Sequence, residues 1–464
     1  MLELKVRDIL EICNGKLILG NEEDILDEFK HDTREIEKGD TYVGVKGENL
    51  NGSELYENAF EIGAKACIVQ DIDIPENKLT KYQDKIIIKV EDCIEALQKI
   101  ALYKRNLSNI PVIGVTGSVG KTSTKDIIAS VMSKKYKTLK TEGNYNNHLG
   151  VPLTLLRLKD HEAAVVEMGM NHLGEIRKLT NIAKPTMSVI TNVGTSHIGE
   201  LGSRENILKA KLEILEGMKD DAPIAINNDN DMLHNWYLEN KEKRRILTFG
   251  IDNKSDIMAN NIISTENGST FTVDINDKEY KVEINVGGKH FVINALCAIC
   301  VWLQNDIEIE NIIEGIKEFK LTKRRMEILE GINNSQVIND SYNASYDSMK
   351  AAIEYLGEIK AEKKIAVLGD MLELGEYEKD LHEKVGEEVY KNNIDILVTV
   401  GERAKHIASR AKSLGMKEDR IFVFDTKDDA VEFLKNIIDK NDYILVKASN
   451  SMKFDMIVNQ IKKL

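Results

Sequence analysis

The chain has 464 residues, and its 42% hydrophobic and 30% charged residues are typical of a water-soluble protein. That length exceeds one compact core and predicts two or three domains. Its 77 acidic residues outnumber 63 basic ones, and the net charge of −14 argues against a nucleic-acid partner. No apolar run is long enough to cross a membrane, and charges populate the segment before Leu19. We therefore expect a cytoplasmic protein without membrane contact.

The segment 1–107 predicts a small α/β domain. Its apolar runs 64–70 and 85–90 are typical of strands, and 92–107 is typical of a helix that ends before Pro111. It carries no phosphate-binding loop, which distinguishes it from the segment that follows.

The segment 108–322 predicts a doubly wound, mostly parallel sheet. Near-continuous apolar runs separated by helical stretches are typical of buried parallel strands. Two later runs alternate in polarity around the pair Asn276 and Asp277, which predicts an antiparallel meander on the same domain. The expected parallel strands are 112–115, 163–167, 187–191 and 223–227, and the meander strands are 270–275 and 280–286.

The segment 323–464 again alternates strands and helices and predicts a second, Rossmann-like α/β domain. It lacks the G-x-G-x-x-G pattern, so dinucleotide binding has no support. Its expected strands are 337–339, 364–368, 394–400, 421–424 and 443–446.

The five cysteines are odd in number and scattered along the chain. Cys297 and Cys300 share a predicted helix over 294–303, with no second pair nearby. Buried free thiols are therefore favoured over a zinc or redox site.

An apolar run over 110–115 leads into a glycine-bounded turn, then Lys121 and Thr122, then a predicted helix. This order is typical of a triphosphate-binding loop, in which the lysine reaches the outer phosphates and the threonine hydroxyl ligates Mg²⁺. The common Walker pattern needs a glycine where Val115 stands, and an ordinary strand-to-helix turn is the alternative. Glycines let the backbone curl, so that successive amides face phosphate oxygens. The loop residues expected to bind ATP are Gly117, Ser118, Val119, Gly120, Lys121, Thr122 and Ser123.

Two polar side chains follow predicted strands at the same edge of this sheet. Glu167 ends the strand 163–167 beside the phosphate loop, where a carboxylate suits Mg²⁺. A helix N-cap or a salt bridge is the alternative for it. His197 follows the strand 187–191, and a neutral imidazole there could ligate a second divalent ion. A loop histidine more often only hydrogen-bonds, which is its alternative.

Lys211 lies in a predicted helix over 203–215. Lys209 lies in the same helix and Lys219 follows it, and solvated helix charge is the default interpretation for all three. Spacing alone therefore does not select Lys211.

Further motifs recur along nearly the whole chain, in segments 32–34, 39–47, 116–123, 143–147, 150–155, 167–169, 191–197, 340–344 and 368–375. Together they closely resemble the Mur ligases, the ATP-dependent amide-forming enzymes of peptidoglycan precursor synthesis. The set is highly specific, whereas the phosphate loop alone would not be.

The resemblance implies an enzyme whose three domains hold different substrates. It implies Thr33, Arg34, Lys46 and Gly47 for a UDP-sugar, with Asn144, Asn147, Tyr342 and Asn343 as further substrate residues. It implies Asn294 near the adenine, and Arg325 with Asp340 closing over the nucleotide. It implies Lys121, Glu167, His197 and Lys211 in catalysis. Two magnesium ions are implied at Thr122, Glu167, His197 and Lys211, the lysine as a carbamate that supplies anionic oxygens.

Three segments depart from the family pattern. Phe291 follows His290 where asparagine is usual, which bears on an adenine contact. Ser345 and Tyr346 stand for a common Asn-Pro, and Asn450 stands for a common arginine. The last two differences bear on the dipeptide-side contacts more than on the ATP chemistry.

The resemblance implies that ATP activates a terminal carboxylate as an acyl phosphate. The amine of D-alanyl-D-alanine would then attack it, extending a UDP-N-acetylmuramoyl-tripeptide. Small-molecule substrates and a monomer are expected. The alternatives are another Mur-type amino-acid ligase, a nucleotide-driven switch or motor, and a relative that binds without turnover. A switch would favour a second carboxylate beside Glu167, where Met168 and Gly169 stand.

Overall fold

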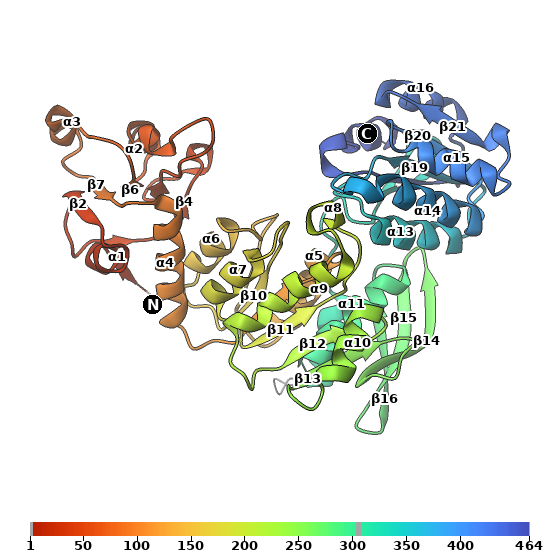
Figure 1. Ribbon diagram of the computed structural model, residues 1–464, viewed down its shortest axis with the longest axis horizontal. Helices are drawn as coiled ribbons and strands as arrows, with labels where there is room; N and C mark the ends of the chain where they lie inside the picture. Colours follow the sequence, from red (N-terminus) through yellow and green to blue (C-terminus); the bar gives the residue numbers. More distant parts are fainter. Residues whose placement is uncertain (1–2, 303–307, 464) are drawn as a thin grey trace.

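The computed structural model describes residues 3–302 and 308–463. Figure 1 shows three bodies in chain order, with the first and the third both seated on the middle one. Their main sheets have five, nine and six strands. The prediction of three α/β domains, with a mostly parallel middle sheet and an antiparallel extension, is confirmed.

The first body has a sheet of order β2-β7-β6-β5-β4, parallel except for β2, and a separate β1–β3 pair. The predicted strands are β6 and β7, and the predicted helix is α4. The Asp92 side chain caps α4 by accepting a hydrogen bond from the Glu95 amide. The elements are β1 (Leu4–Lys5), α1 (Val6–Cys13), β2 (Lys16–Leu19), β3 (Ile25–Leu26), β4 (Phe29–Lys30), β5 (Thr41–Val43), α2 (Tyr56–Ile62), β6 (Ala66–Val69), α3 (Glu76–Lys81), β7 (Ile86–Lys89) and α4 (Cys93–Asn106).

The middle body has a sheet of order β16-β15-β14-β13-β12-β11-β8-β10-β9, in which only β15 and β16 run antiparallel to their neighbours. Asn276 and Asp277 turn the β15–β16 hairpin with φ of 51° and 60°, values that these residue types tolerate. The strands are β8 (Val112–Thr116), β9 (Thr138–Lys140), β10 (Ala163–Glu167), β11 (Met187–Ile190), β12 (Ile224–Asn227), β13 (Ile246–Gly250), β14 (Ile257–Thr265), β15 (Gly268–Ile275) and β16 (Lys278–Ile284). The helices are α5 (Lys121–Met132), α6 (Gly150–Leu156), α7 (Glu175–Ala183), α8 (Ile198–Leu201), α9 (Arg204–Leu212), α10 (Asp231–Asn240), α11 (Lys289–Trp302) and α12 (Ile309–Lys317).

The third body has a sheet of order β17-β18-β22-β19-β20-β21, parallel except for the edge strand β17. The five predicted strands are present, and β17 was not predicted. The strands are β17 (Glu327–Glu330), β18 (Gln336–Asn339), β19 (Lys364–Gly369), β20 (Ile396–Val400), β21 (Ile421–Phe424) and β22 (Tyr443–Lys447). The helices are α13 (Tyr346–Glu358), α14 (Glu378–Lys391), α15 (Lys405–Ser413), α16 (Lys427–Ile437) and α17 (Asp455–Ile461).

Two predicted helices differ in extent from the observed ones. The helix predicted over 294–303 begins earlier, at Lys289, and Leu303 lies outside the described residues. The helix predicted over 203–215 ends at Leu212, where a 3₁₀ turn (Glu213–Gly217) continues it. Tighter turns of this kind are common at helix ends.

The five cysteines are buried free thiols, as predicted. Burial raises the pKa of the Cys297 and Cys300 thiols, which keeps them protonated and inert. In the two described ranges, the helices are too short or too polar for a bilayer crossing.

Candidate active site

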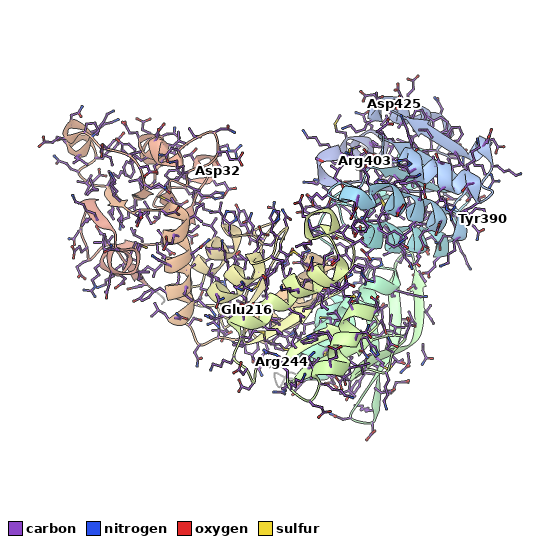
Figure 2. All side chains as sticks on the ribbon, viewed as in Figure 1. Asp32, Glu216, Arg244, Tyr390, Arg403 and Asp425 are labelled. Atoms are coloured by element: carbon purple, nitrogen blue, oxygen red, sulfur yellow. The ribbon has the colours of Figure 1, made fainter. Side chains whose placement is uncertain are left out.

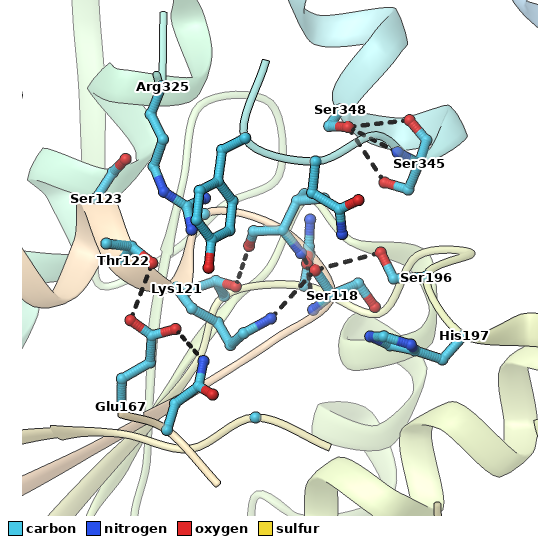
Figure 3. A pocket seen from close by; sticks show the side chains of 18 of the residues that line it. Ser118, Lys121, Thr122, Ser123, Glu167, Ser196, His197, Arg325, Ser345 and Ser348 are labelled. Atoms are coloured by element: carbon cyan, nitrogen blue, oxygen red, sulfur yellow. Dashed lines mark hydrogen bonds between the residues drawn. The ribbon is translucent and has the colours of Figure 1, made fainter. Parts of the chain in front are cut away.

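A cavity of about 610 Å³ opens between the middle and third domains. It lies at the carboxyl ends of β8, β10 and β11, where doubly wound sheets bind their ligands. One wall carries the loop between β8 and α5, and the opposite wall comes from segments around Arg325, Tyr342 and Ser345 (Figure 3). The site is therefore complete only where the two domains meet.

Close packing shapes the loop between β8 and α5. A Cβ on Gly117 would lie 1.8 Å from Thr191 Oγ1, so only glycine fits there. Gly120 has a φ of 82°, in the left-handed region that favours glycine. Because α5 begins at Lys121, its first amides have no acceptor inside the helix and face the cavity end of the loop. The predicted strand–loop–helix geometry is present.

The expectation that successive loop amides face the cavity is wrong for two of them. The amides of Ser118 and Val119 donate to Asn192 Oδ1, at 3.0 and 2.9 Å. Sequence reasoning noted Asn192 only as part of a motif. The amides left to face the cavity are those at the start of α5.

Lys121 lies back over the loop. Its Nζ donates to Gly117 O at 2.8 Å and to Ser118 O at 3.3 Å. Burial lowers the Lys121 pKa, the Glu167 carboxylate opposes this, and the Arg325 guanidinium reinforces it. A phosphate anion would stabilise the charged form that burial disfavours.

Glu167 and Thr122, both predicted metal ligands, lie in direct contact. Glu167 is 1% exposed, and its carboxylate accepts hydrogen bonds from Thr122 Oγ1 (2.9 Å) and Asn146 Nδ2 (2.8 Å). It caps no helix, because β10 ends at it and α7 begins at Glu175. Sequence reasoning missed Asn146, which lay inside a recognised motif and orients this carboxylate.

His197 stands at the start of α8 with a φ of 63°. Its Nδ1 lies 2.7 Å from the Glu373 carboxylate of the third domain. The His197 pKa is lowered, because burial and the nearby Lys121 outweigh the opposing effect of the Glu373 carboxylate. The hydrogen bond to Nδ1 leaves Nε2 as the atom for a metal ion.

The surface interpretation of Lys211 is wrong. Lys211 is 1% exposed, whereas Lys209 and Lys219 are exposed as expected. Burial and nearby Lys121 lower the Lys211 pKa well below its ordinary value, and Asp347 opposes them. Lys211 does not line the cavity itself. Its placement depends on how α9 packs, and the residue pattern does not encode that.

Arg325 and Asp340 occupy the third-domain wall but bond to different neighbours. The Arg325 guanidinium lies 4.0 Å from the Tyr342 ring centre, a cation–π contact, and its buried Nε has no hydrogen-bond partner in the described chain. Asp340 accepts hydrogen bonds from the Met326 amide and from Lys447 Nζ. Lys447, which sequence reasoning did not single out, is a buried cation facing the cavity.

Asn294 lies near the phosphate loop, on α11. It is buried, lines the cavity, and accepts a hydrogen bond from Thr124 Oγ1 at 3.0 Å. His290 also lines the cavity, with its ring 4.4 Å from the Phe291 ring, and burial lowers its pKa to about 4. At neutral pH this imidazole is therefore uncharged.

The predicted UDP-sugar residues lie away from the cavity, on the first body. Arg34 pairs with Asp32 and lowers the pKa of that carboxyl to about 2. Asp32 lies on the side of the first body that faces the third (Figure 2). Lys46 pairs with Asp71 at 3.0 Å. The structure does not bring Thr33, Arg34, Lys46 or Gly47 together with the phosphate loop.

The other four predicted substrate residues are divided between two domains. Tyr342 and Asn343 line the cavity, whereas Asn144 is exposed outside it. Asn147 lines the cavity, and its Oδ1 accepts hydrogen bonds from the Leu149 and Gly150 amides. Its side-chain oxygen therefore accepts hydrogen bonds from backbone amides at the start of α6.

The departures from the family pattern on the third domain have local structural explanations. Ser345 caps α13 in a reciprocal box with Ser348, a task that asparagine performs equally well. Tyr346 is partly buried against the hydrophobic core, and its hydroxyl donates a hydrogen bond to Glu388 at 3.3 Å. Asn450 Oδ1 accepts a hydrogen bond from Arg324 at 3.3 Å, so a cation still lies at this place.

The fold and cavity define a three-domain α/β nucleotide-binding protein with its site at a domain boundary. Comparisons with known proteins are more specific. Three family models match: Mur ligase family, catalytic domain (28–105), Mur ligase middle domain (115–302), and Mur ligase, glutamate ligase domain (324–450). The chain belongs to the Mur ligase family.

Relatives match along their full length. The UDP-N-acetylmuramoyl-tripeptide–D-alanyl-D-alanine ligase of Bacillus subtilis is 36% identical, covering 99% of both chains. The Escherichia coli ligase of the same name is 31% identical, covering 100% of this chain and 99% of its own. MurF from Acinetobacter baumannii has a TM-score of 0.88 at 27% identity, covering 98% of both chains. MurF from Thermotoga maritima in complex with ADP has a TM-score of 0.79 at 28% identity, covering 94% and 96%.

Proposed function

We propose that this protein joins D-alanyl-D-alanine to UDP-N-acetylmuramoyl-tripeptide in an ATP-dependent reaction. The observation that carries the proposal is the cavity at the boundary of two domains, with a phosphate loop and a buried carboxylate on one wall and cations on the other. The names of the full-length relatives support the two peptide substrates. The ADP in the Thermotoga maritima structure supports the nucleotide. The proposal includes a monomer that acts in the cytoplasm.

The residues present fit a triphosphate with magnesium. Glu167 and Thr122 offer the oxygen ligands that Mg²⁺ prefers, and His197 offers a nitrogen ligand for a second ion. The buried Nε of Arg325, which has no partner among residues 3–302 and 308–463, is a donor that an anionic ligand would satisfy. When bound, the ions neutralise charge on the phosphates.

Lys211 fits a carbamate. Carbon dioxide adds to an uncharged amine, and burial favours that form of Lys211. The product would be an anionic oxygen ligand in place of a cation. We propose that Lys211, as this carbamate, supplies oxygen ligands to the metal site.

The reaction brings two anions together, because a carboxylate attacks the γ-phosphate. Lys121 and Arg325 supply positive charge where negative charge develops, which is the main way proteins accelerate phosphoryl transfer. The carboxylate oxygen forms a bond to phosphorus as ADP leaves, giving an acyl phosphate. The dipeptide amine then attacks the acyl carbon, and inorganic phosphate leaves. Contact between the two walls excludes water that would hydrolyse this intermediate.

We propose a division of substrates among the three domains. Residues 1–107 hold the UDP-sugar, with Thr33, Arg34, Lys46 and Gly47 as contacts. Residues 108–322 hold ATP, with Asn294 near the adenine and Asn144 and Asn147 toward the peptide substrate. Residues 323–464 close over the nucleotide through Arg325 and Asp340 and meet the dipeptide through Tyr342 and Asn343. The cavity supports the nucleotide part, because its two walls come from the last two segments.

The test is an ADP-release assay with purified protein, ATP, Mg²⁺, UDP-sugar tripeptide and D-alanyl-D-alanine, with each component omitted in turn. We expect ADP release to require all of them, and mass spectrometry to detect the pentapeptide product. ADP release without the dipeptide would instead favour a nucleotide-driven switch. Binding of ATP without any amide product would favour a relative without turnover. Preference for a single amino acid would favour another Mur-type ligase.

A further inference from the structure

Asp347 reaches from the third domain into the loop that carries His197. Its Oδ2 accepts hydrogen bonds from the Thr195 amide at 2.7 Å and from Thr195 Oγ1 at 2.8 Å. A Cβ on Gly194 would lie 2.3 Å from this oxygen, so glycine is required for the approach. A carboxylate that accepts two hydrogen bonds makes a strong, directional contact.

The loop of residues 194–197 is also hydrogen-bonded to the phosphate loop. The Gly194 amide donates to Ser118 Oγ at 2.9 Å, and Ser196 Oγ donates to the Ser118 carbonyl at 3.3 Å. That carbonyl also accepts from Lys121 Nζ at 3.3 Å, as Figure 3 shows. Hydrogen bonds therefore run from Asp347, through residues 194–196, to the lysine of the phosphate loop.

A second contact joins the two domains without reaching the phosphate loop. The Gly199 amide donates to Glu373 O at 3.1 Å, and a Cβ on Gly199 would lie 2.6 Å from the Gly375 amide. The Tyr377 hydroxyl donates to Gly202 O at 2.7 Å. These contacts lie at α8, on the far side of His197. Glu373 also bonds the His197 ring of this loop, but Asp347 bonds Thr195, whose two chain neighbours both bond Ser118. Among the described residues, Asp347 therefore makes the more direct of the two contacts toward Lys121.

We propose that Asp347 is a positioning residue that couples docking of the third domain to the arrangement of the nucleotide-binding loop. The cavity has Lys121 on one wall and Arg325 on the other, so a nucleotide contacts both only while the domains stay docked. Loss of the Asp347 contact separates the walls and loosens the loop, which weakens nucleotide binding. This inference rests on the nucleotide site of the proposed function.

The first test measures docking in the ligand-free full chain. Spin labels go on Lys209→Cys in the middle domain and Ser413→Cys in the third, both exposed positions, while the native cysteines are buried. We expect one narrow distance distribution, and Asp347→Ala should broaden it. The matched control is Asp428→Ala, which removes an exposed first-turn acid from α16 and should leave the distribution unchanged. An unchanged distribution for Asp347→Ala would overturn the proposal.

The second test measures the affinity for a fluorescent ADP analogue. We expect about tenfold weaker binding by Asp347→Ala, from the loss of a charge-assisted contact. Asp347→Asn keeps an acceptor for the Thr195 amide and should bind with intermediate affinity, which a merely structural role would not produce. Unchanged affinity in Asp347→Ala would contradict the coupling. Failure of the unsubstituted protein to bind the analogue would instead count against the proposed function, and the distance measurement would still test docking.

A double-substitution cycle separates coupling from misfolding. Gly194→Ala places a methyl group where the Asp347 carboxylate lies, so it should weaken analogue binding as Asp347→Ala does. Once the carboxylate is absent, the methyl group has room, so Gly194→Ala should add little in the Asp347→Ala background. Fully additive losses would overturn the proposal. If either variant fails to fold, Thr195→Val removes only the hydroxyl half of the contact and should give about threefold weaker binding.

Discussion

The phosphate-loop wall of the cavity and the predicted sugar-nucleotide residues of the first domain are built in opposite ways. Glu167 is almost fully buried and hydrogen-bonded to Thr122. Arg34 and Lys46 have side chains that are 86% and 57% exposed, and they pair with neighbouring aspartates. Exposed pairs contribute little to stability and rearrange easily, whereas a buried polar network keeps its geometry. The proposed ATP end is therefore arranged in advance, and the proposed sugar end can adjust to its ligand.

The largest test of this contrast is Lys121→Ala. Because the lysine supplies charge inside an otherwise fixed wall, we expect about a 10³-fold loss of amide formation. The assay is ADP release with all substrates, checked by product mass. The exposed Lys219→Ala serves as the control and should keep full activity. Retained turnover in Lys121→Ala would remove the central cation from the proposed mechanism.

Lys211→Ala should have the next largest effect, about a 10²-fold loss of turnover. A short carboxylic acid such as acetate should restore part of the activity, because it would replace the anionic oxygens of the proposed carbamate. Lys209→Ala, two residues earlier but exposed, provides the matched comparison. Equal losses in the two variants, or no rescue by acetate, would exclude the carbamate and leave Lys211 a packing residue.

Protonation of His290 should have a smaller effect, on the stability of the protein. This effect tests whether the cavity wall around His290 is packed before a ligand binds. Burial holds its folded-state pKa near 4 against an ordinary value of 6.5. Below pH 6.5 the unfolded chain binds a proton that the folded chain does not, so stability should fall as pH drops from 6.5 toward 4. Urea midpoints across that range should fall less steeply in His290→Gln. Parallel curves for the two proteins would mean that this imidazole is not buried in solution.

The smallest expected effect concerns the exposed ion pairs of the first domain. Arg34→Ala should leave the thermal unfolding midpoint unchanged, because the Arg34 side chain is 86% exposed and exposed ion pairs contribute little to stability. Calorimetric titration should find affinity for the UDP-sugar peptide reduced tenfold or less, at about the scale of one exposed charged contact, with ADP affinity unaffected. Lys99→Ala, an exposed lysine of α4, is the control. A large loss of stability would contradict the contrast between the two regions.

Much of the fold follows from local sequence patterns. Continuous apolar runs predicted β8, β10, β11 and β12, because strands buried on both faces have no polar side to alternate with. The glycines and Lys121 predicted the phosphate loop, because few other backbones allow that turn. Strands β1 to β5, β9, β13, β14 and β17 escaped prediction, because tertiary pairing defines these strands more than local composition does.

The site residues that the sequence did not reveal are those that hydrogen-bond to the predicted ones. Asn146 orients Glu167, Asn192 holds two loop amides, and Lys447 neutralises Asp340. Each contact joins positions far apart in the chain, which spacing does not report. The residue pattern alone left Lys211 with a surface interpretation for the same reason, because only the packed position of α9 reveals its burial.

The Asn192 carboxamide holds the phosphate loop in its curved conformation from within the protein. Its oxygen already satisfies the amides of Ser118 and Val119, so part of the loop's curvature does not depend on any bound molecule. Departure of spent nucleotide then leaves a loop that is still shaped for the next one. Successive turnovers avoid the entropy of reordering this segment each time.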